Sequence, residues 1–133
     1  MLLVDDNEYN LYALRIMLEM FGIQSDFANN GEKAIEMVEA ERCCGYRCIL
    51  MDLDMPVMGG YEATGILLHM IKAREIDPID IIAVTANGQD SIRSKCLKHG
   101  FTAFIEKPIF LDILVSHLKK YFKKNFFLLP KDW

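Results

Sequence analysis

Apolar and polar positions along the chain follow two alternating patterns. Short runs of mostly apolar, β-prone residues predict strands, and longer stretches with apolar residues three or four positions apart predict amphipathic helices. Strands are expected at residues 2–4, 23–27, 48–51, 81–85 and 103–106. Helices are expected at residues 8–21, after the Asn30-Gly31 turn, at 61–74, at 89–98 and from Pro108 to about residue 122.

Four of the predicted helices have an apolar face that should point toward a core. These faces comprise Leu11, Leu14, Leu18 and Phe21, then Ala34, Ile35 and Val38, then Ile92, Cys96 and Leu97, and finally Ile113, Leu114, Leu118 and Phe122. Strict alternation of strands and helices is typical of parallel βαβ units with right-handed crossovers. We therefore predict an α/β fold: a doubly wound five-stranded parallel sheet of order 2-1-3-4-5 with helices on both faces, in the flavodoxin-like arrangement.

Length, charge and composition narrow the class of protein. A chain of 133 residues suits one domain, expected over residues 1–123, with residues 124–133 as a C-terminal tail or linker. The formal charge of −4 argues against nucleic-acid binding, which needs a concentrated basic surface. The chain has no membrane-length apolar run and no secretory signal, and its four cysteines lack a convincing zinc-site pattern. A cytoplasmic domain without membrane contact is predicted.

Polar groups stand at the ends of four predicted strands whose interiors are apolar. Asp5 and Asp6 follow the first strand, Asp52 and Asp54 the third, Thr85 ends the fourth, and Lys107 follows the fifth. In a doubly wound sheet the carboxyl ends of the strands meet at one edge, and ligand sites lie there. We therefore expect these residues to gather at one site.

The residue types at the strand ends indicate phosphoryl transfer. Crowded carboxylates repel one another, and Mg²⁺ relieves the repulsion because it binds carboxylate oxygens while keeping some of its waters. A lysine ammonium and a threonine hydroxyl can both pair with anionic oxygens. Metal, hydroxyl and ammonium around one carboxylate nucleophile form a phosphoryl-transfer constellation. Taken alone, Asp5 and Asp6 would be interpreted as caps of the first helix.

Four segments resemble the receiver domains of two-component response regulators, and the resemblance covers essentially the whole chain. They are residues 2–7 (LLVDDN), 49–60 (ILMDLDMPVMGG), 83–86 (AVTA) and 106–108 (EKP). The resemblance implies that Asp52 is the phosphoacceptor, that Asp6 and Asp52 bind the metal directly, and that Asp5 acts through a water. It also implies that Asp54 provides its backbone carbonyl to the metal. Gly59 departs from the family, in which an acidic residue is common there.

The resemblance also assigns roles near the ends of the fourth and fifth strands. Thr85 would be the switch hydroxyl, Lys107 would pair with a phosphoryl oxygen, and Phe104 falls on the aromatic switch position. We expect packing alone to stabilise the inward ring of Phe104, which lacks a tyrosine's hydroxyl. The Lys107–Pro108 bond is expected to be cis, as in members of the family.

Two stretches, DDNEYN and MPVMGGYEAT, are most similar to receivers fused to hybrid histidine kinases. The resemblance implies Mg²⁺ or Mn²⁺ as cofactor, and a histidine kinase, a histidine-phosphotransfer protein or both as partner, with a weak homodimer as a further association. Tyr9, Tyr12 and Ala13 on the first helix would supply much of the docking face. We expect no turnover enzyme, but a terminal receiver in a phosphorelay, on its own or as the cytoplasmic part of a membrane-bound kinase. A free-standing regulator that docks on a target protein is the alternative.

Two other functions compete with this interpretation. The segment around Asp52 and Asp54 also resembles the first motif of haloacid-dehalogenase-type phosphatases, with Asp52 as nucleophile and Asp54 as general acid. Against it, a full βαβ unit precedes the motif, and no further acidic pair follows the lysine. A non-phosphorylated interaction module of the same fold is the second rival, and the intact acidic cluster argues against it.

Overall fold

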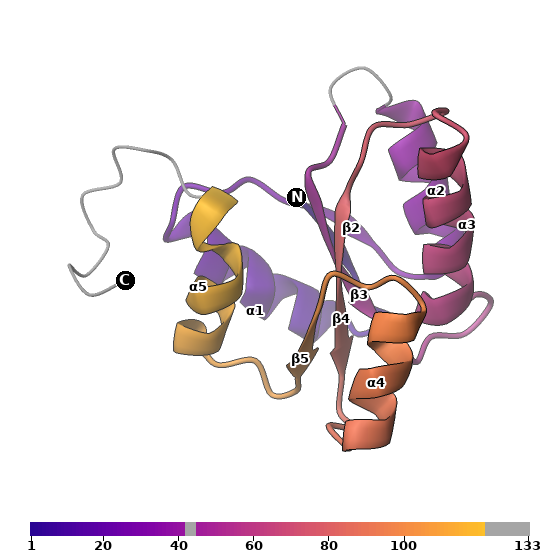
Figure 1. The fold of residues 1–133 in the computed structure, drawn as a ribbon. Coiled ribbons are helices and arrows are strands. Elements are labelled where there is room, and N and C mark those ends of the chain that lie inside the picture. The colour runs from indigo at the N-terminus through magenta and orange to yellow at the C-terminus, as the bar shows by residue number, and fades with distance from the viewer. Residues whose placement is uncertain (42–44, 122–133) are drawn as a thin grey trace.

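The computed structural model describes residues 1–41 and 45–121. Its elements are β1 (Leu2–Val4), α1 (Glu8–Glu19), β2 (Asp26–Ala28), α2 (Gly31–Ala40), β3 (Cys48–Asp52), α3 (Gly60–Lys72), β4 (Asp80–Thr85), α4 (Asp90–Lys98), β5 (Ala103–Glu106), α5 (Leu111–Leu118) and the 3₁₀ turn η1 (Lys119–Tyr121). The strands in this part of the chain form one parallel sheet of order β2-β1-β3-β4-β5, which confirms the predicted fold and strand order. In Figure 1, α1 and α5 lie on one side of the sheet, and α2, α3 and α4 lie on the other.

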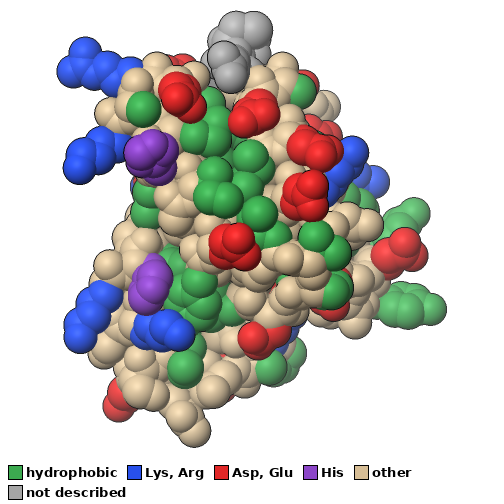
Figure 2. Space-filling view, turned by 90° about the vertical axis from the view of Figure 1, so that its right-hand side faces the viewer, with side chains coloured by type: hydrophobic (Ala, Val, Ile, Leu, Met, Phe, Trp, Pro, Cys, Tyr) green, Lys and Arg blue, Asp and Glu red, His purple; other side chains and the backbone are tan. Residues whose placement is uncertain are grey.

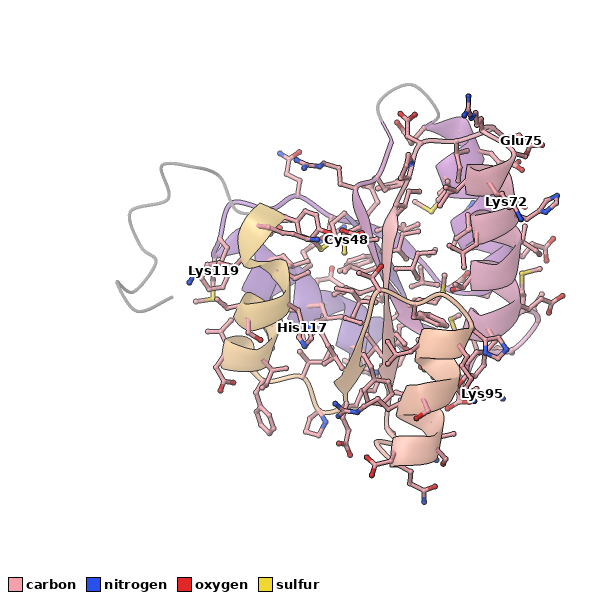
Figure 3. The ribbon with its side chains drawn as sticks, in the orientation of Figure 1. Cys48, Lys72, Glu75, Lys95, His117 and Lys119 are labelled. Carbon is pink, nitrogen blue, oxygen red and sulfur yellow. The ribbon has the colours of Figure 1, made fainter. Side chains whose placement is uncertain are left out.

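Each apolar strand contributes to two cores, because successive side chains of a strand point to opposite faces. In β3, Ile49 and Met51 pack with the residues of α2, α3 and α4, whereas Cys48 and Leu50 pack with those of α1 and α5. Figure 3 shows Cys48 on the α5 side of the sheet. The central strand is buried along its whole length, which explains why its sequence is continuously apolar up to Asp52.

The second strand is shorter than predicted and lies further along the chain. The pattern predicted a strand at residues 23–27, whereas β2 covers Asp26–Ala28. β1 has only three residues, and its register pairs Leu2 with Asp26 and Val4 with Ala28. Only residues 26–28 therefore have partners on β1 for the hydrogen bonds of a strand. Ile23 is buried, but its N–H donates to the carbonyl of Leu18 and closes the end of α1.

The first helix ends two residues before the predicted position. The predicted apolar face is confirmed, since all four of its residues are buried. The helix itself stops at Glu19, and Gly22 follows with φ of 72°, a conformation that glycine adopts without strain. The N–H of Gly22 donates to the carbonyl of Glu19, so the chain turns there and Phe21 is buried outside the helix.

Two residues that were predicted to face the core are exposed. Leu97 is 57% exposed and Ile113 is 42% exposed. In each helix the adjacent residue, Cys96 or Leu114, is the buried one. In α5 the buried residues are Leu114, Val115 and Leu118. Neighbouring helical positions lie about 100° apart, so this face turns Ile113 away from the sheet, and the burial of Cys96 turns Leu97 away in α4. The predicted inward position of Phe122 and the predicted tail fall outside the described residues.

None of the helices in the described part of the chain is long and apolar enough to cross a lipid bilayer.

Candidate functional site

The register of the sheet brings two acidic segments together at its carboxyl edge. β1 and β3 are neighbours, and Val4 pairs with Met51, so Asp5 and Asp52 follow side by side. One carboxylate oxygen from each of Asp5, Asp6 and Asp52 lies within 4.8 Å of the others. Asp5 and Asp52 are buried and Asp6 is exposed, so the cluster is open to solvent on one side.

Lys107 brings a positive charge to this acidic cluster from the end of β5. Its Nζ lies 3.0 Å from Oδ2 of Asp5 and 3.5 Å from Oδ1 of Asp52. Its backbone N–H donates to the carbonyl of Thr85 at 2.8 Å, which joins the ends of β4 and β5. The peptide bond to Pro108 is cis, as predicted. The structure therefore places Lys107 beside both buried carboxylates.

Asp5 is held by two asparagines that the sequence analysis did not single out. The backbone N–H of Asn7 donates to Oδ1 of Asp5 at 2.9 Å, and the side-chain amide of Asn10 donates to Oδ2 at 3.2 Å. Asn7 is also the N-cap of α1 and accepts from the N–H of Tyr9. The interpretation of Asp5 and Asp6 as helix caps is therefore wrong. An asparagine directly before the helical pattern was the signal for this cap.

The surroundings of Asp52 disfavour its charged form when no metal is bound. Burial and the charge of Asp5 raise its pKa to about 6, although Lys107 and the N–H of Asp54 act in the opposite direction. Burial alone would lower the pKa of Lys107, but the neighbouring carboxylates raise it above its ordinary value. A single ammonium therefore does not neutralise the two buried carboxylates beside it.

Thr85 ends β4 next to this cluster. Asp52 pairs with Val84 across the sheet, so Thr85 lies one position beyond that pair, and its side chain is buried. Its Oγ1 accepts a hydrogen bond from the N–H of Asn87 at 3.2 Å. Within the described residues, no hydrogen bond joins Thr85 to the acidic cluster. A move of this hydroxyl toward Asp52 would have to break the bond to Asn87.

Phe104 is buried with its side chain 8% exposed, in the core between the sheet and the α2, α3 and α4 layer. The guanidinium of Arg93 lies 5.2 Å from the centre of its ring. This cation–π contact adds to the packing of the buried ring. The prediction that packing alone stabilises the inward ring after Thr85 has moved stays a prediction.

Asp54 contacts Asp52 through its backbone. Its N–H donates to Oδ1 of Asp52 at 3.4 Å, while its side chain is exposed and does not belong to the carboxylate cluster of the described residues. The loop then returns to the sheet, where the Gly60 N–H donates to the carbonyl of Leu53. A Cβ on Gly60 would lie 2.4 Å from the carbonyl oxygen of Asp52, so only glycine fits at this return.

A groove lies beside the buried carboxylates, between α1 and the ends of β4 and β5. It has a volume of about 430 Å³, and Asp5 and Lys107 are among its lining residues. Ala13, Met17 and Ile109 provide part of its apolar wall. Tyr9 and Tyr12 are 87% and 61% exposed on α1, so they lie off its buried face, as predicted.

Comparison with known proteins shows which family this chain is similar to. Residues 1–119 match the family model of the response regulator receiver domain. Hybrid signal transduction histidine kinase B of Dictyostelium discoideum is 36% identical over 129 residues; the match covers 90% of this chain but only 6% of that kinase.

Two solved structures are also similar. The receiver domain of a sensor histidine kinase from Pseudomonas aeruginosa, with a magnesium ion in its active-site cleft, has a TM-score of 0.73 and 32% identity, with 90% of this chain and 93% of that one covered. The co-crystal structure of the Saccharomyces cerevisiae histidine phosphotransfer protein Ypd1 with the receiver domain of Ssk1 gives a TM-score of 0.82 and 28% identity, with 90% and 86% covered.

Proposed function

The chain belongs to the response regulator receiver domain family, and on that premise we propose that Asp52 accepts a phosphoryl group from a phosphohistidine. The observation that carries the proposal is the buried Asp52 carboxylate, placed between two further carboxylates and a lysine at the carboxyl edge of the sheet. This edge is where a doubly wound sheet forms its site.

The transfer exchanges one bond to phosphorus for another. A carboxylate oxygen of Asp52 attacks the phosphorus of the phosphohistidine, a P–O bond forms and the P–N bond breaks. The electron pair of the broken bond remains on the imidazole nitrogen, which takes up a proton. Lys107 lies within 3.5 Å of the acceptor carboxylate, so its ammonium can pair with a developing phosphoryl oxygen.

The carboxylates of this chain fit a divalent cation. Asp5, Asp6 and Asp52 offer three carboxylate oxygens within 4.8 Å of one another, and oxygen ligands of this charge suit Mg²⁺. The Pseudomonas relative supports this choice because its structure has magnesium in the active-site cleft. We propose that Asp6 and Asp52 bind the ion directly, Asp5 through a water, and Asp54 through its carbonyl; Mn²⁺ would suit the same ligands. When bound, the ion neutralises charge on the phosphoryl oxygens.

The proposed partners are a histidine kinase and a histidine-phosphotransfer protein. The resemblance to hybrid kinases and to a receiver solved with Ypd1 supports this choice. Tyr9 and Tyr12 are exposed on the outer face of α1. Ala13 is also exposed, and it lines the groove that leads to Asp5 and Lys107. A helical partner that covers α1 would therefore lie next to the acidic cluster.

The phosphatase alternative is less well supported by the geometry. It requires the Asp54 carboxylate as a general acid near Asp52. In the described structure only the backbone N–H of Asp54 contacts Asp52, and the Asp54 side chain is exposed. The receiver proposal needs only the backbone of this residue.

We expect the chain to gain one phosphoryl group when it is incubated with acetyl phosphate and Mg²⁺. Intact-mass spectrometry measures the product, and a chelator should reduce labelling at least tenfold, because the charge of the phosphoryl oxygens is then poorly neutralised. Labelling that is equal with and without the chelator would contradict the proposed metal dependence.

We also propose that the Thr85 hydroxyl binds the phosphoryl group on Asp52 and thereby changes the surface formed by α4, β5 and α5. Thr85→Ala should still accept phosphate on Asp52, but it should lose most of the chemical-shift changes on α4, β5 and α5, because no hydroxyl is available to bind the phosphoryl oxygen. Thr85→Ser keeps the hydroxyl and should retain those changes. Two-dimensional NMR of the phosphorylated forms measures the difference, and equal changes in the alanine variant and wild type would argue against this coupling.

A further inference from the structure

Asn10 connects α1 to the acidic cluster through one half of its side-chain amide. It lies in the first turn of α1, and its Nδ2 donates to Oδ2 of Asp5 at 3.2 Å. The same oxygen accepts a hydrogen bond from Nζ of Lys107 at 3.0 Å. Because an ionised carboxylate only accepts hydrogen bonds, the amide nitrogen of Asn10 must face Asp5, and its amide oxygen is left for another donor.

The side-chain oxygen of Asn10 is accessible and has no donor. Asn10 is half-buried, and among the described residues no N–H or O–H group donates to its Oδ1. In that part of the chain, the side-chain oxygens that lack a partner and are sealed from solvent belong to Ser25 and Thr64. The Asn10 oxygen is not one of them, so a molecule that enters the site can reach it.

The groove beside the acidic cluster surrounds this oxygen with apolar walls. Asn10 lines the groove together with Asp5 and Lys107, and Ala13 and Ile109 belong to its apolar wall. An imidazole ring has two largely apolar faces and carries its nitrogens at the ring edge. A groove of about 430 Å³ with apolar walls and a free acceptor suits such a ring.

We infer that Oδ1 of Asn10 accepts a hydrogen bond from the donor imidazole while its phosphoryl group passes to Asp52, an inference that rests on the proposed function. A phosphorylated imidazole that is protonated on its second nitrogen carries a positive charge and one N–H. When the P–N bond breaks, its electron pair stays on the nitrogen that held phosphorus, and a neutral imidazole leaves. The hydrogen bond from the cationic N–H to the amide oxygen is charge-assisted, so it orients the ring that leaves.

The contacts of the site place Asn10 near the transfer to Asp52. Nζ of Lys107 lies 3.0 Å from Oδ2 of Asp5, the oxygen that Asn10 contacts, and 3.5 Å from Oδ1 of Asp52. One carboxylate oxygen of Asp5 lies within 4.8 Å of one of Asp52. The two nitrogens of an imidazole are separated by a single ring carbon. One ring can therefore present its phosphoryl group to Asp52 and its N–H to Asn10.

Asn10 also has a simpler role, which is to orient the Asp5 carboxylate. That carboxylate is held at its other oxygen by the N–H of Asn7 at 2.9 Å. A residue that acts only through Asp5 affects every phosphodonor alike, because the acidic cluster is common to all of them. A residue that holds the imidazole affects only donors that contain an imidazole. A comparison of two donors therefore separates these roles.

The test compares labelling by monophosphoimidazole with labelling by acetyl phosphate, which has no ring N–H, in the presence of Mg²⁺. The readout is the ratio of the two second-order rate constants, measured by intact-mass spectrometry. Asn10→Ala should lower this ratio about tenfold, because a hydrogen bond to a charged donor is lost. Asn29→Ala, which removes an exposed amide directly after β2, should leave the ratio unchanged.

Only labelling of Asp52 counts in this ratio. Histidine side chains lie on the surface in Figure 2, and His69 and His99 are exposed. An imidazole nitrogen can itself take up a phosphoryl group, so each rate is corrected by the rate for Asp52→Asn, in which any side labelling remains. The corrected rates report phosphoryl transfer to Asp52 alone.

Asn10→Asp separates the oxygen acceptor from the contact with Asp5. Aspartate has the shape of asparagine and keeps an oxygen for the imidazole N–H, but it cannot donate to Asp5 and repels it. Both rate constants should fall, whereas their ratio should stay at or above the wild-type value. A ratio that falls as far as in Asn10→Ala, or less than a threefold fall in Asn10→Ala itself, overturns the inference and leaves the proposed function intact. If neither donor labels Asp52 of wild type, the proposed function fails, and the inference fails with it.

Discussion

Asp52→Asn is expected to take up no phosphoryl group, either from acetyl phosphate or from a phosphorylated histidine-phosphotransfer protein. An amide oxygen is a far weaker nucleophile than a carboxylate oxygen, and the variant also removes one of three charged oxygens in the proposed metal site. Intact-mass spectrometry of wild type and variant under identical conditions measures the effect, and we expect labelling of the variant to fall at least a hundredfold.

Asp54→Asn is the matched control for this loss. Its side chain is exposed and only its backbone N–H contacts Asp52, so labelling should remain within a few fold of wild type. The phosphatase alternative predicts the opposite, because it makes the Asp54 carboxylate the general acid. Substantial labelling of Asp52→Asn at another residue would show that Asp52 is not the acceptor.

The second large effect concerns stability without metal: Asp52→Asn should be more stable than wild type at neutral pH. The pKa of Asp52 is raised from 3.8 to about 6 in the folded chain. The folded state thus binds the proton more tightly than the unfolded state does, and stability falls as pH rises from about 4 through 6. Asparagine cannot ionise, so at pH 7.5 the variant should gain about 1–3 kcal/mol in the free energy of unfolding.

Denaturant unfolding in the presence of a chelator, repeated at pH 7.5 and pH 4, measures this gain. The difference between variant and wild type should shrink toward pH 4, where Asp52 is largely protonated in the folded wild type. Asp77→Asn, on an exposed loop position, should stay within about 0.5 kcal/mol of wild type. Added Mg²⁺ should stabilise wild type more than Asp52→Asn, because binding to the folded state alone adds to its stability. A variant less stable than wild type at pH 7.5 would contradict the crowded-carboxylate picture.

Local pattern in the sequence predicted most of the fold. Apolar runs and helical spacing are properties of neighbouring residues, so β1 and β5 were located at their observed bounds and the buried face of α1 was identified residue by residue. Where a boundary depended on a distant partner, the prediction was wrong. β2 is set by the three residues of β1 that it pairs with, and the exposure of Leu97 and Ile113 is set by which residues of α4 and α5 face the sheet.

The sequence alone also indicated which residue types gather at the site, because strand ends of a parallel sheet meet at one edge. Only the tertiary structure decided how they meet. The pairing of Val4 with Met51 makes Asp5 and Asp52 neighbours, and the return of β5 brings Lys107 to both, 102 residues from Asp5 along the chain. The raised pKa of Asp52 follows from that burial and crowding.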